Sequence, residues 1–101
     1  MSRRVVTTPV AEAQIASIDD WWRAHRPAAP GLFLAEFQEA VGILADLPFA
    51  GARYPLSPIA GVRRLLLTQS RYHVYYVVLI DVVIVLAVWH ASRGEGPTFE
   101  R

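Results

Sequence analysis

Residues 62–93 decide the fold of this chain: VRRLLLTQSRYHVYYVVLIDVVIVLAVWHASR. The most apolar part, residues 74–89, carries a single formal charge, at Asp81. A membrane-spanning helix needs about 20 apolar residues and rarely holds an unpaired carboxylate at its centre. The run is also rich in valine, isoleucine and tyrosine, which favour pleated, half-buried positions. We therefore predict an antiparallel β-meander that turns near residues 80–81, and no association with a membrane.

Composition limits the chemistry that the chain can perform. A chain of 101 residues has room for one domain, residues 1–101, and 53% hydrophobic with 19% charged residues is typical of a globular protein. The net charge of +1 gives no strong global attraction to nucleic acid or anionic lipid. All ten Lys+Arg positions are arginine, which is not a base at neutral pH. Proton transfer would therefore need a histidine, a carboxylate or a tyrosine.

Cysteine content and the N-terminal sequence indicate the cellular compartment. The absence of cysteine excludes disulfides and thiolate metal sites, and it fits a reducing cytoplasm. The N-terminal sequence MSRRVVTTPV lacks the apolar core of a signal peptide. We expect a cytoplasmic protein.

The first half of the chain predicts a strand and two helices. Residues 4–7 are a short β-branched run, and Thr8 with Pro9 then forms a typical helix start. Prolines and a glycine in residues 27–31 end this helix, and a second one is predicted over residues 32–47. The short connection indicates an antiparallel helical hairpin. The first helix carries an apolar stripe: Ala11, Ile15, Ile18 and Trp22.

The second half predicts a loop and three strands. Residues 49–61 are rich in proline and glycine, which indicates an irregular surface loop. Strands are predicted at residues 62–67, 72–79 and 82–90. The apolar third strand is predicted either to be central in the sheet, covered on both faces, or to expose an apolar face that binds a partner. The fold class is α+β: a short N-terminal strand and an antiparallel helical hairpin packed on a three- to four-stranded antiparallel sheet.

Basic residues mark the ends of these strands and form the candidate site. In a three-stranded meander, one end of the sheet should bring together Arg71, His73, His90 and Arg93. Arg63 and Arg64 should lie nearer the opposite end. These residues could form a basic rim for phosphate or for acidic groups of a partner. The alternative is that they are solvated strand ends.

Histidine and tyrosine provide the remaining candidates. His90 is the best single candidate for acid–base work, because imidazole titrates near neutral pH. The three histidines show no metal-ligand spacing, and no nucleotide-binding or nucleophile motif is present, so we expect no metal and no cofactor. Alternation places Tyr72 and Tyr76 on one face and Tyr75 with His73 on the other. Packing in and around the core explains these tyrosines better than base stacking.

The chain resembles the RelE/ParE superfamily of bacterial toxins over nearly its whole length. Four segments carry the resemblance: TPVAEAQIASIDDWWRAHRP at 8–27, GLFLAEFQEAVGILADLP at 31–48, VRRLLLTQSRYHVYYVV at 62–78 and LAVWHASRG at 86–94. The resemblance implies a small cytoplasmic toxin of a type II toxin–antitoxin pair. It also implies a toxin–antitoxin hetero-oligomer, in which the tail of a co-encoded antitoxin wraps an apolar groove.

The residues at family positions favour the ParE-like branch, which acts on DNA gyrase. RelE-like members cut ribosome-bound mRNA with basic residues and a tail tyrosine. Arg64 matches one of these basic positions, but the others fall on Leu66, His73 and Ala91, and the tail holds Phe99. Leucine, alanine and phenylalanine neither accept a proton nor stabilise a phosphorane. The resemblance therefore implies a non-enzymatic gyrase inhibitor.

Two alternatives stay open from the sequence. One is a RelE-like, ribosome-dependent mRNA endonuclease in which His90 or His73 is the acid or base, and Arg64 and Arg71 hold phosphates. The other is a degenerate toxin that retains only antitoxin binding. For the gyrase-directed reading, the residues expected to contact the target or its phosphates are Arg63, Arg64, Arg71 and Arg93.

Overall fold

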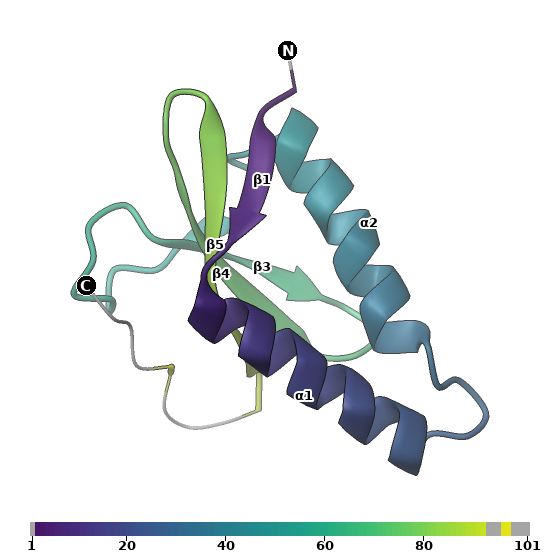
Figure 1. Ribbon diagram of the computed structural model, residues 1–101. Coiled ribbons are helices and arrows are strands. Elements are labelled where there is room, and N and C mark those ends of the chain that lie inside the picture. The colour runs from purple at the N-terminus through teal and green to yellow at the C-terminus, as the bar shows by residue number, and fades with distance from the viewer. Residues whose placement is uncertain (1, 93–95, 98–101) are drawn as a thin grey trace.

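The computed structural model describes residues 2–92 and 96–97, which form two helices and five strands in one α+β arrangement (Figure 1). The helices follow the first strand and precede the other four. In chain order the elements are β1 (Arg4–Thr7), α1 (Pro9–His25), α2 (Leu32–Asp46), β2 (Ala52–Arg53), β3 (Arg63–Leu67), β4 (Tyr72–Val78) and β5 (Val82–His90).

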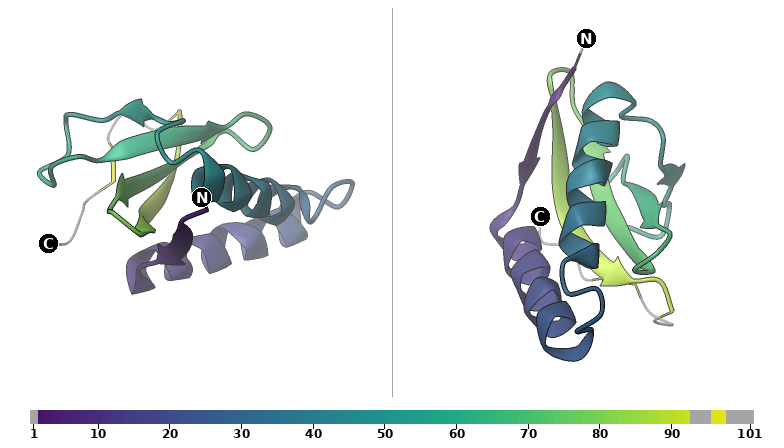
Figure 2. Two further views of the ribbon diagram at one scale, coloured as in Figure 1. Left: turned by 90° about the horizontal axis from the view of Figure 1, so that it is seen from above. Right: turned by 90° about the vertical axis from the view of Figure 1, so that its right-hand side faces the viewer.

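Helix α1 begins where the sequence predicts, because Thr8 satisfies a free backbone donor of its first turn. The Thr8 Oγ1 accepts a hydrogen bond from the Ala11 N–H at 3.1 Å, and Pro9 occupies the first helical position. Glu12 in the same turn suits the positive end of the helix dipole and accepts from Thr7 Oγ1. The two helices lie side by side and run in opposite directions, as the predicted hairpin requires (Figure 1, Figure 2).

The sheet has five strands in the order β1-β5-β4-β3-β2, and it is mixed rather than wholly antiparallel. Strand β5 lies between β4, which is antiparallel to it, and β1, which is parallel to it from Arg4↔Val82 to Thr7↔Val85. The α+β class and the central place of residues 82–90 are confirmed. The strand count and the all-antiparallel pairing are corrected, because the helical hairpin returns the chain to the far edge and leaves β1 beside the last strand.

The main core lies between the two helices and one face of the sheet, which we call the helix face (Figure 2). Phe33 and Leu44 of α2 are fully buried there against Val74, Tyr76 and other residues of β4 and β5. Tyr72 also packs on this core, whereas Tyr75 belongs to a separate cluster. The alternation predicted for the tyrosines is therefore confirmed.

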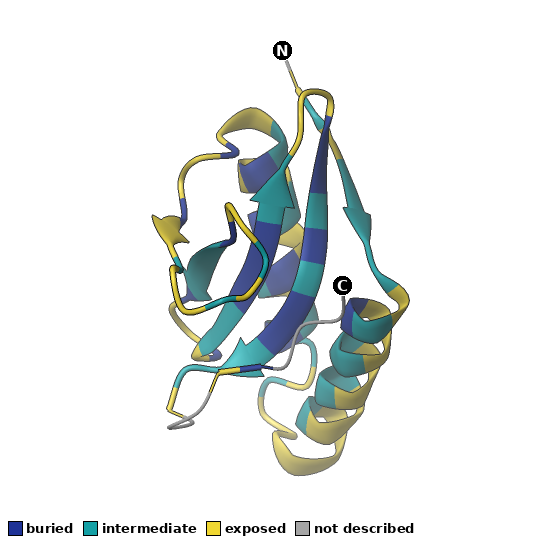
Figure 3. Cartoon of the chain, turned by 90° about the vertical axis from the view of Figure 1, so that its left-hand side faces the viewer, coloured by how far each residue is buried: buried dark blue, intermediate teal, exposed yellow. Residues whose placement is uncertain are grey.

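The opposite side of the sheet, which we call the outer face, is covered in part by the segment between β2 and β3 (Figure 3). Tyr54, Ile59 and Val62 pack there against Tyr75 and Ala87. The prediction of an irregular, largely exposed loop over residues 49–61 is confirmed in the main, and the structure adds the short strand β2 and the packing of Tyr54 and Ile59 on the sheet. Short apolar side chains in a Pro/Gly-rich stretch give little sequence signal, yet they bury a second, smaller core.

A membrane span is not found within the described part of the chain. Neither α1 nor α2 combines the length and the apolar character that crossing a bilayer requires.

Candidate functional site

The outer face carries a pocket of about 280 Å³ at the end where β4 begins and β5 ends. Arg64 of β3 and His73 of β4 line it, together with Tyr75, which pairs with Arg64 across the two strands. Arg53 and Tyr54 close it from the loop side, and the end of β5 forms its rim. The lining residues are Arg53, Tyr54, Pro55, Leu56, Arg64, His73, Tyr75, Trp89, His90, Ala91 and Gly96.

His73 is one of the two histidines that line this pocket. Burial lowers the pKa of His73 from 6.5, and the charges of Arg64 and then Arg71 lower it further. The imidazole is therefore neutral at pH 7, so it can accept a proton or a hydrogen bond. Its ring centroid lies 5.9 Å from that of Tyr75 in an edge arrangement.

The Arg64 guanidinium packs against an aromatic ring. Its guanidinium carbon lies 5.0 Å from the ring centroid of Tyr54, which itself meets Tyr75 edge-on at 4.9 Å. Among the residues that the structure describes, no aspartate or glutamate lines this pocket. The pocket therefore offers cations and aromatic surface to an anionic group.

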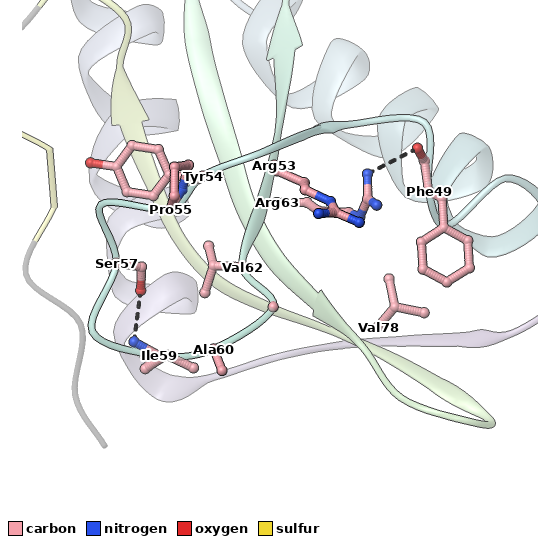
Figure 4. A pocket seen from close by; sticks show the side chains of 11 residues that line it. Phe49, Arg53, Tyr54, Pro55, Ser57, Ile59, Ala60, Val62, Arg63 and Val78 are labelled. Carbon is pink, nitrogen blue, oxygen red and sulfur yellow. Dashed lines mark hydrogen bonds between the residues drawn. The ribbon is translucent and has the colours of Figure 1, made fainter.

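A second outer-face pocket, of about 420 Å³, adjoins the first and shares Arg53, Tyr54 and Pro55 with it (Figure 4). Arg53 and Arg63 are cross-strand partners in the short β2–β3 ladder. Arg63 already donates from Nη1 to the carbonyl oxygens of Gly51, at 2.8 Å, and of Phe49, at 3.4 Å. Arg63 thus holds the loop, while the Arg53 side chain is exposed beside it.

His90 lies at the end of β5 and meets Tyr72 of the helix face edge-on at 4.9 Å. Its Nδ1 accepts a hydrogen bond from the Ser92 backbone N–H at 3.1 Å and lies 2.7 Å from Ser92 Oγ. Because a backbone N–H only donates, Nδ1 is the unprotonated nitrogen and Nε2 carries the hydrogen. In this tautomer the imidazole offers Nε2–H as a donor, which does not suit a general base.

The structure brings the predicted site residues together differently from the sequence expectation. Arg64 was expected near the far end of the sheet, but it lines one pocket with His73 and with the end of β5. The reason is the shortness of β3, which places Arg64 opposite Tyr75, only two residues along β4 from His73. Arg71 lies in the β3–β4 turn, and Arg93 lies outside the described residues.

Sequence reasoning missed Arg53 and Tyr54, both of which line the two outer-face pockets. They follow Gly51 in a stretch without periodicity, so no pattern indicated that they fold back over the sheet. The signal that could have found them is an arginine–tyrosine pair just before Pro55. Among residues 2–92 and 96–97, no group of three or more histidine, aspartate or glutamate residues is arranged to hold a metal ion.

Comparisons with known proteins agree with this geometry. A family model described as "ParE toxin of type II toxin-antitoxin system, parDE" matches residues 5–94. The fold is similar to that of a chain from the chromosomal ParDE system of P. aeruginosa, with a TM-score of 0.73 and 22% identity over 90% of this chain and 98% of that chain. It is also similar to that of a free mutant of the E. coli toxin RelE, with a TM-score of 0.57 and 18% identity over 91% and 86% of the two chains. No curated protein matches the sequence.

The fold and the family match together define the class: this is a toxin of a type II toxin–antitoxin system. The chain belongs to the ParE toxin family. The resemblance to the RelE/ParE superfamily, and to its ParE-like branch in particular, is confirmed.

Proposed function

We propose that this toxin inhibits DNA gyrase and that a co-encoded antitoxin neutralises it in the cytoplasm. The observation that carries the proposal is the make-up of the outer-face pocket. It offers Arg64, Arg53 and aromatic rings, and of its two histidines His90 already has its Nδ1 bound by the Ser92 N–H. Guanidinium groups bind anions and partner carboxylates without shuttling protons. This pocket therefore suits docking to a target better than catalysis on one.

The chemistry of RNA cleavage sharpens this argument. Cutting a phosphodiester by general acid–base catalysis needs a base for the attacking hydroxyl and an acid for the leaving oxygen. His73 can fill one of these roles, but its cross-strand neighbours are Leu66 and Trp89, and the residue that follows β5 in the pocket is Ala91. None of these three side chains transfers a proton. The other proton-transferring side chains that line the described pocket are His90, Tyr54 and Tyr75, and none of them is a cross-strand partner of His73.

Exposed apolar side chains support the antitoxin as a partner. Leu47 and Phe49 beyond α2, and Leu79 and Ile80 in the β4–β5 turn, are all exposed. Isolated apolar residues are normal on protein surfaces, but several large ones on a chain of this size favour a bound partner. We expect the toxin to be recovered in good yield with its antitoxin and in poor yield without it.

One observation keeps an mRNA endonuclease as a second candidate. His73 is neutral and lies beside Arg64, an arrangement in which a base and a phosphate-binding cation share one pocket. In that case His73 rather than His90 would be the base, because the Nδ1 of His90 is occupied by Ser92.

The deciding experiment is to induce the chain in bacteria without antitoxin and to assay purified gyrase and ribosome-dependent mRNA cleavage in parallel. Loss of supercoiling or trapped DNA breaks, with intact mRNA, is the expected result. Codon-phased mRNA cuts with normal gyrase activity would overturn the proposal. A folded chain without effect in either assay would indicate a degenerate toxin that retains only antitoxin binding.

Two sets of variants separate docking from catalysis. Arg64→Gln is expected to weaken gyrase inhibition about tenfold, since it removes a charge from the contact surface. The matched control is Arg23→Gln, on α1 and paired with Asp19, which should change inhibition less than about twofold. His73→Gln and His90→Gln should both remain toxic. Loss of toxicity in either, with normal folding, would point to acid–base catalysis.

A further inference from the structure

A third pocket, of about 430 Å³, lies at the C-terminal end of α1. Trp22 and Arg26 come to it from the end of this helix, Arg71 from the β3–β4 turn, and Tyr72 and His90 from the adjacent ends of β4 and β5. We call it the α1-end pocket. It lies toward the helix face, because its aromatic wall contains Tyr72, which packs on the main core, rather than Tyr75 of the outer face.

Arg26 is pre-organised at this pocket. Its backbone N–H donates to the Trp22 carbonyl at 2.9 Å, which ends α1 and fixes where the side chain starts. The guanidinium carbon lies 4.9 Å from the ring centroid of Trp21 and 5.8 Å from that of Trp22. Two indole faces therefore hold the cation, and neither of them neutralises its charge.

Arg71 sits in a backbone conformation that an arginine rarely adopts. Its φ is 68°, in the left-handed region that favours glycine, and it is the single non-glycine residue of this kind among residues 2–92 and 96–97. Hydrogen bonds from Arg71 N–H to the Leu67 carbonyl and from Ala91 N–H to the Arg71 carbonyl hold this geometry. Glycine would be more stable at this position of the turn. The presence of arginine there indicates that the exposed guanidinium of Arg71 has a function.

Among the described residues, no aspartate or glutamate lines the pocket itself. The carboxylate of Glu36, next to this turn, already accepts from the Gln69 N–H, the Ser70 N–H and the Ser70 hydroxyl. His90 presents Nε2–H, because its Nδ1 accepts from Ser92. Two buried side-chain atoms near the end of α1, the Trp22 Nε1–H donor and the Asp19 Oδ1 acceptor, have no hydrogen-bond partner among the described residues.

The number of donors favours phosphate over carboxylate. Two guanidinium forks that each bind in a bidentate manner would use all of the about four lone-pair sites of a carboxylate, and His90 Nε2–H would remain unpaired. A phosphate group presents three or more acceptor oxygens and a larger negative charge, and planar guanidinium forks match its geometry. We propose that the α1-end pocket is a phosphate-binding site formed by Arg26, Arg71 and His90. This inference is independent of the target proposed above.

The direct test is a ¹H–¹⁵N NMR titration of the full chain with inorganic phosphate, against sodium acetate at equal ionic strength. We expect saturable shifts of the Trp22 indole N–H and the Arg26 side-chain N–H with phosphate, and at least tenfold weaker binding of acetate. Equal binding of the two anions, or no saturation with phosphate, would overturn the proposal.

The source of the phosphate is resolved by three further probes: a mononucleotide, a single-stranded DNA oligomer and a DNA duplex. Each of two outcomes supports the site, and each identifies a different ligand. Binding of either DNA at least tenfold tighter than inorganic phosphate would identify a phosphodiester backbone as the ligand. Similar affinities for all phosphate-bearing probes would identify a small phosphorylated compound.

Variants separate phosphate binding from folding. Arg71→Gly relieves the left-handed backbone, so it should raise the unfolding midpoint while weakening phosphate binding at least tenfold. Arg26→Gln should weaken binding to a similar extent, and Arg23→Gln, one turn earlier and paired with Asp19, should change it less than twofold. Wild-type affinity in Arg71→Gly would show that Arg71 has no part in binding and would refute the assignment.

Discussion

The two faces of the sheet use the same strands for different purposes. On the helix face, two helices cover a continuous core in which Phe33, Leu44 and Tyr76 are fully buried. On the outer face, a loop covers a small cluster around Tyr75, and pockets lined by Arg53, Arg64 and His73 stay open beside it. The larger core lies on the helix face, and the residues proposed to dock the toxin's target lie on the outer face. The α1-end pocket, which lies toward the helix face, is proposed for a separate ligand.

The largest expected effect contrasts one aromatic residue from each face. Phe33→Ala should lower the free energy of unfolding by about 3–5 kcal/mol, because it leaves a cavity under α2 that cannot collapse. Tyr54→Ala on the outer face removes a half-buried ring and should cost about 1–2 kcal/mol. Denaturant unfolding followed by circular dichroism measures both values. Equal losses would mean that the outer cluster contributes as much to folding as the main core.

Gly51 links the loop before β2 to Tyr76 of the main core, and a substitution at Gly51 measures how much this close contact contributes to stability. Its N–H donates to the Tyr76 hydroxyl at 2.8 Å, and a Cβ placed there would lie 2.5 Å from that hydroxyl and 2.7 Å from the Arg64 carbonyl oxygen. Gly51→Ala should therefore cost about 1–3 kcal/mol. The control is Gly42→Ala in α2, where a Cβ meets nothing within 4 Å and should add about 0.5–1 kcal/mol of stability. Similar effects in the two variants would rule out a close approach at Gly51.

Glu36 joins the helix hairpin to the β3–β4 turn, and its effect depends on pH. Burial raises the pKa of Glu36, but hydrogen bonds from Gln69 and Ser70 outweigh it, and the pKa falls below 4.5. The carboxylate therefore stabilises the fold above pH 4.5, and this contribution is lost as the pH falls through the lowered pKa.

We expect Glu36→Gln to cost about 1–2 kcal/mol at pH 7 and to make stability less dependent on pH below 4.5. Thermal unfolding at a series of pH values measures both effects. Glu39→Gln, an exposed change on the same helix, serves as the control. If stability below pH 4.5 depends on pH in the same way in Glu36→Gln as in the wild type, the hydrogen bonds from Gln69 and Ser70 to the Glu36 carboxylate do not form in solution.

The smallest effect concerns the titration of His73 on the outer face. Its pKa lies below 6.5 because of burial, Arg64 and Arg71, so protonation of the unfolded chain reduces stability slightly as the pH falls below 6.5. NMR titration of the imidazole should give a midpoint below 6.5, and Arg64→Gln should move that midpoint upward. A midpoint unaffected by Arg64→Gln would show that the charge of Arg64 does not influence His73, which contradicts one shared site.

Many elements of this fold follow from local sequence patterns. The Thr8–Pro9 start of α1, the apolar periods of both helices and the strand at residues 82–90 were predicted from the sequence, because each depends on neighbouring residues. The family resemblance was also available from the order of these segments. Arg63, Arg64 and His73 of β3 and β4 could be named as site candidates from the same patterns.

Tertiary structure alone decided how these elements meet. The parallel pairing of β1 with β5, the placement of Arg53 and Tyr54 over the sheet and the grouping of Arg64 with His73 all join residues far apart in the chain. Strand register and loop packing set these contacts, and both depend on burial summed over the whole domain. The left-handed backbone of Arg71 belongs to this second group, because only the closed β3–β4 turn, tied to Glu36 and Ala91, imposes it on an arginine.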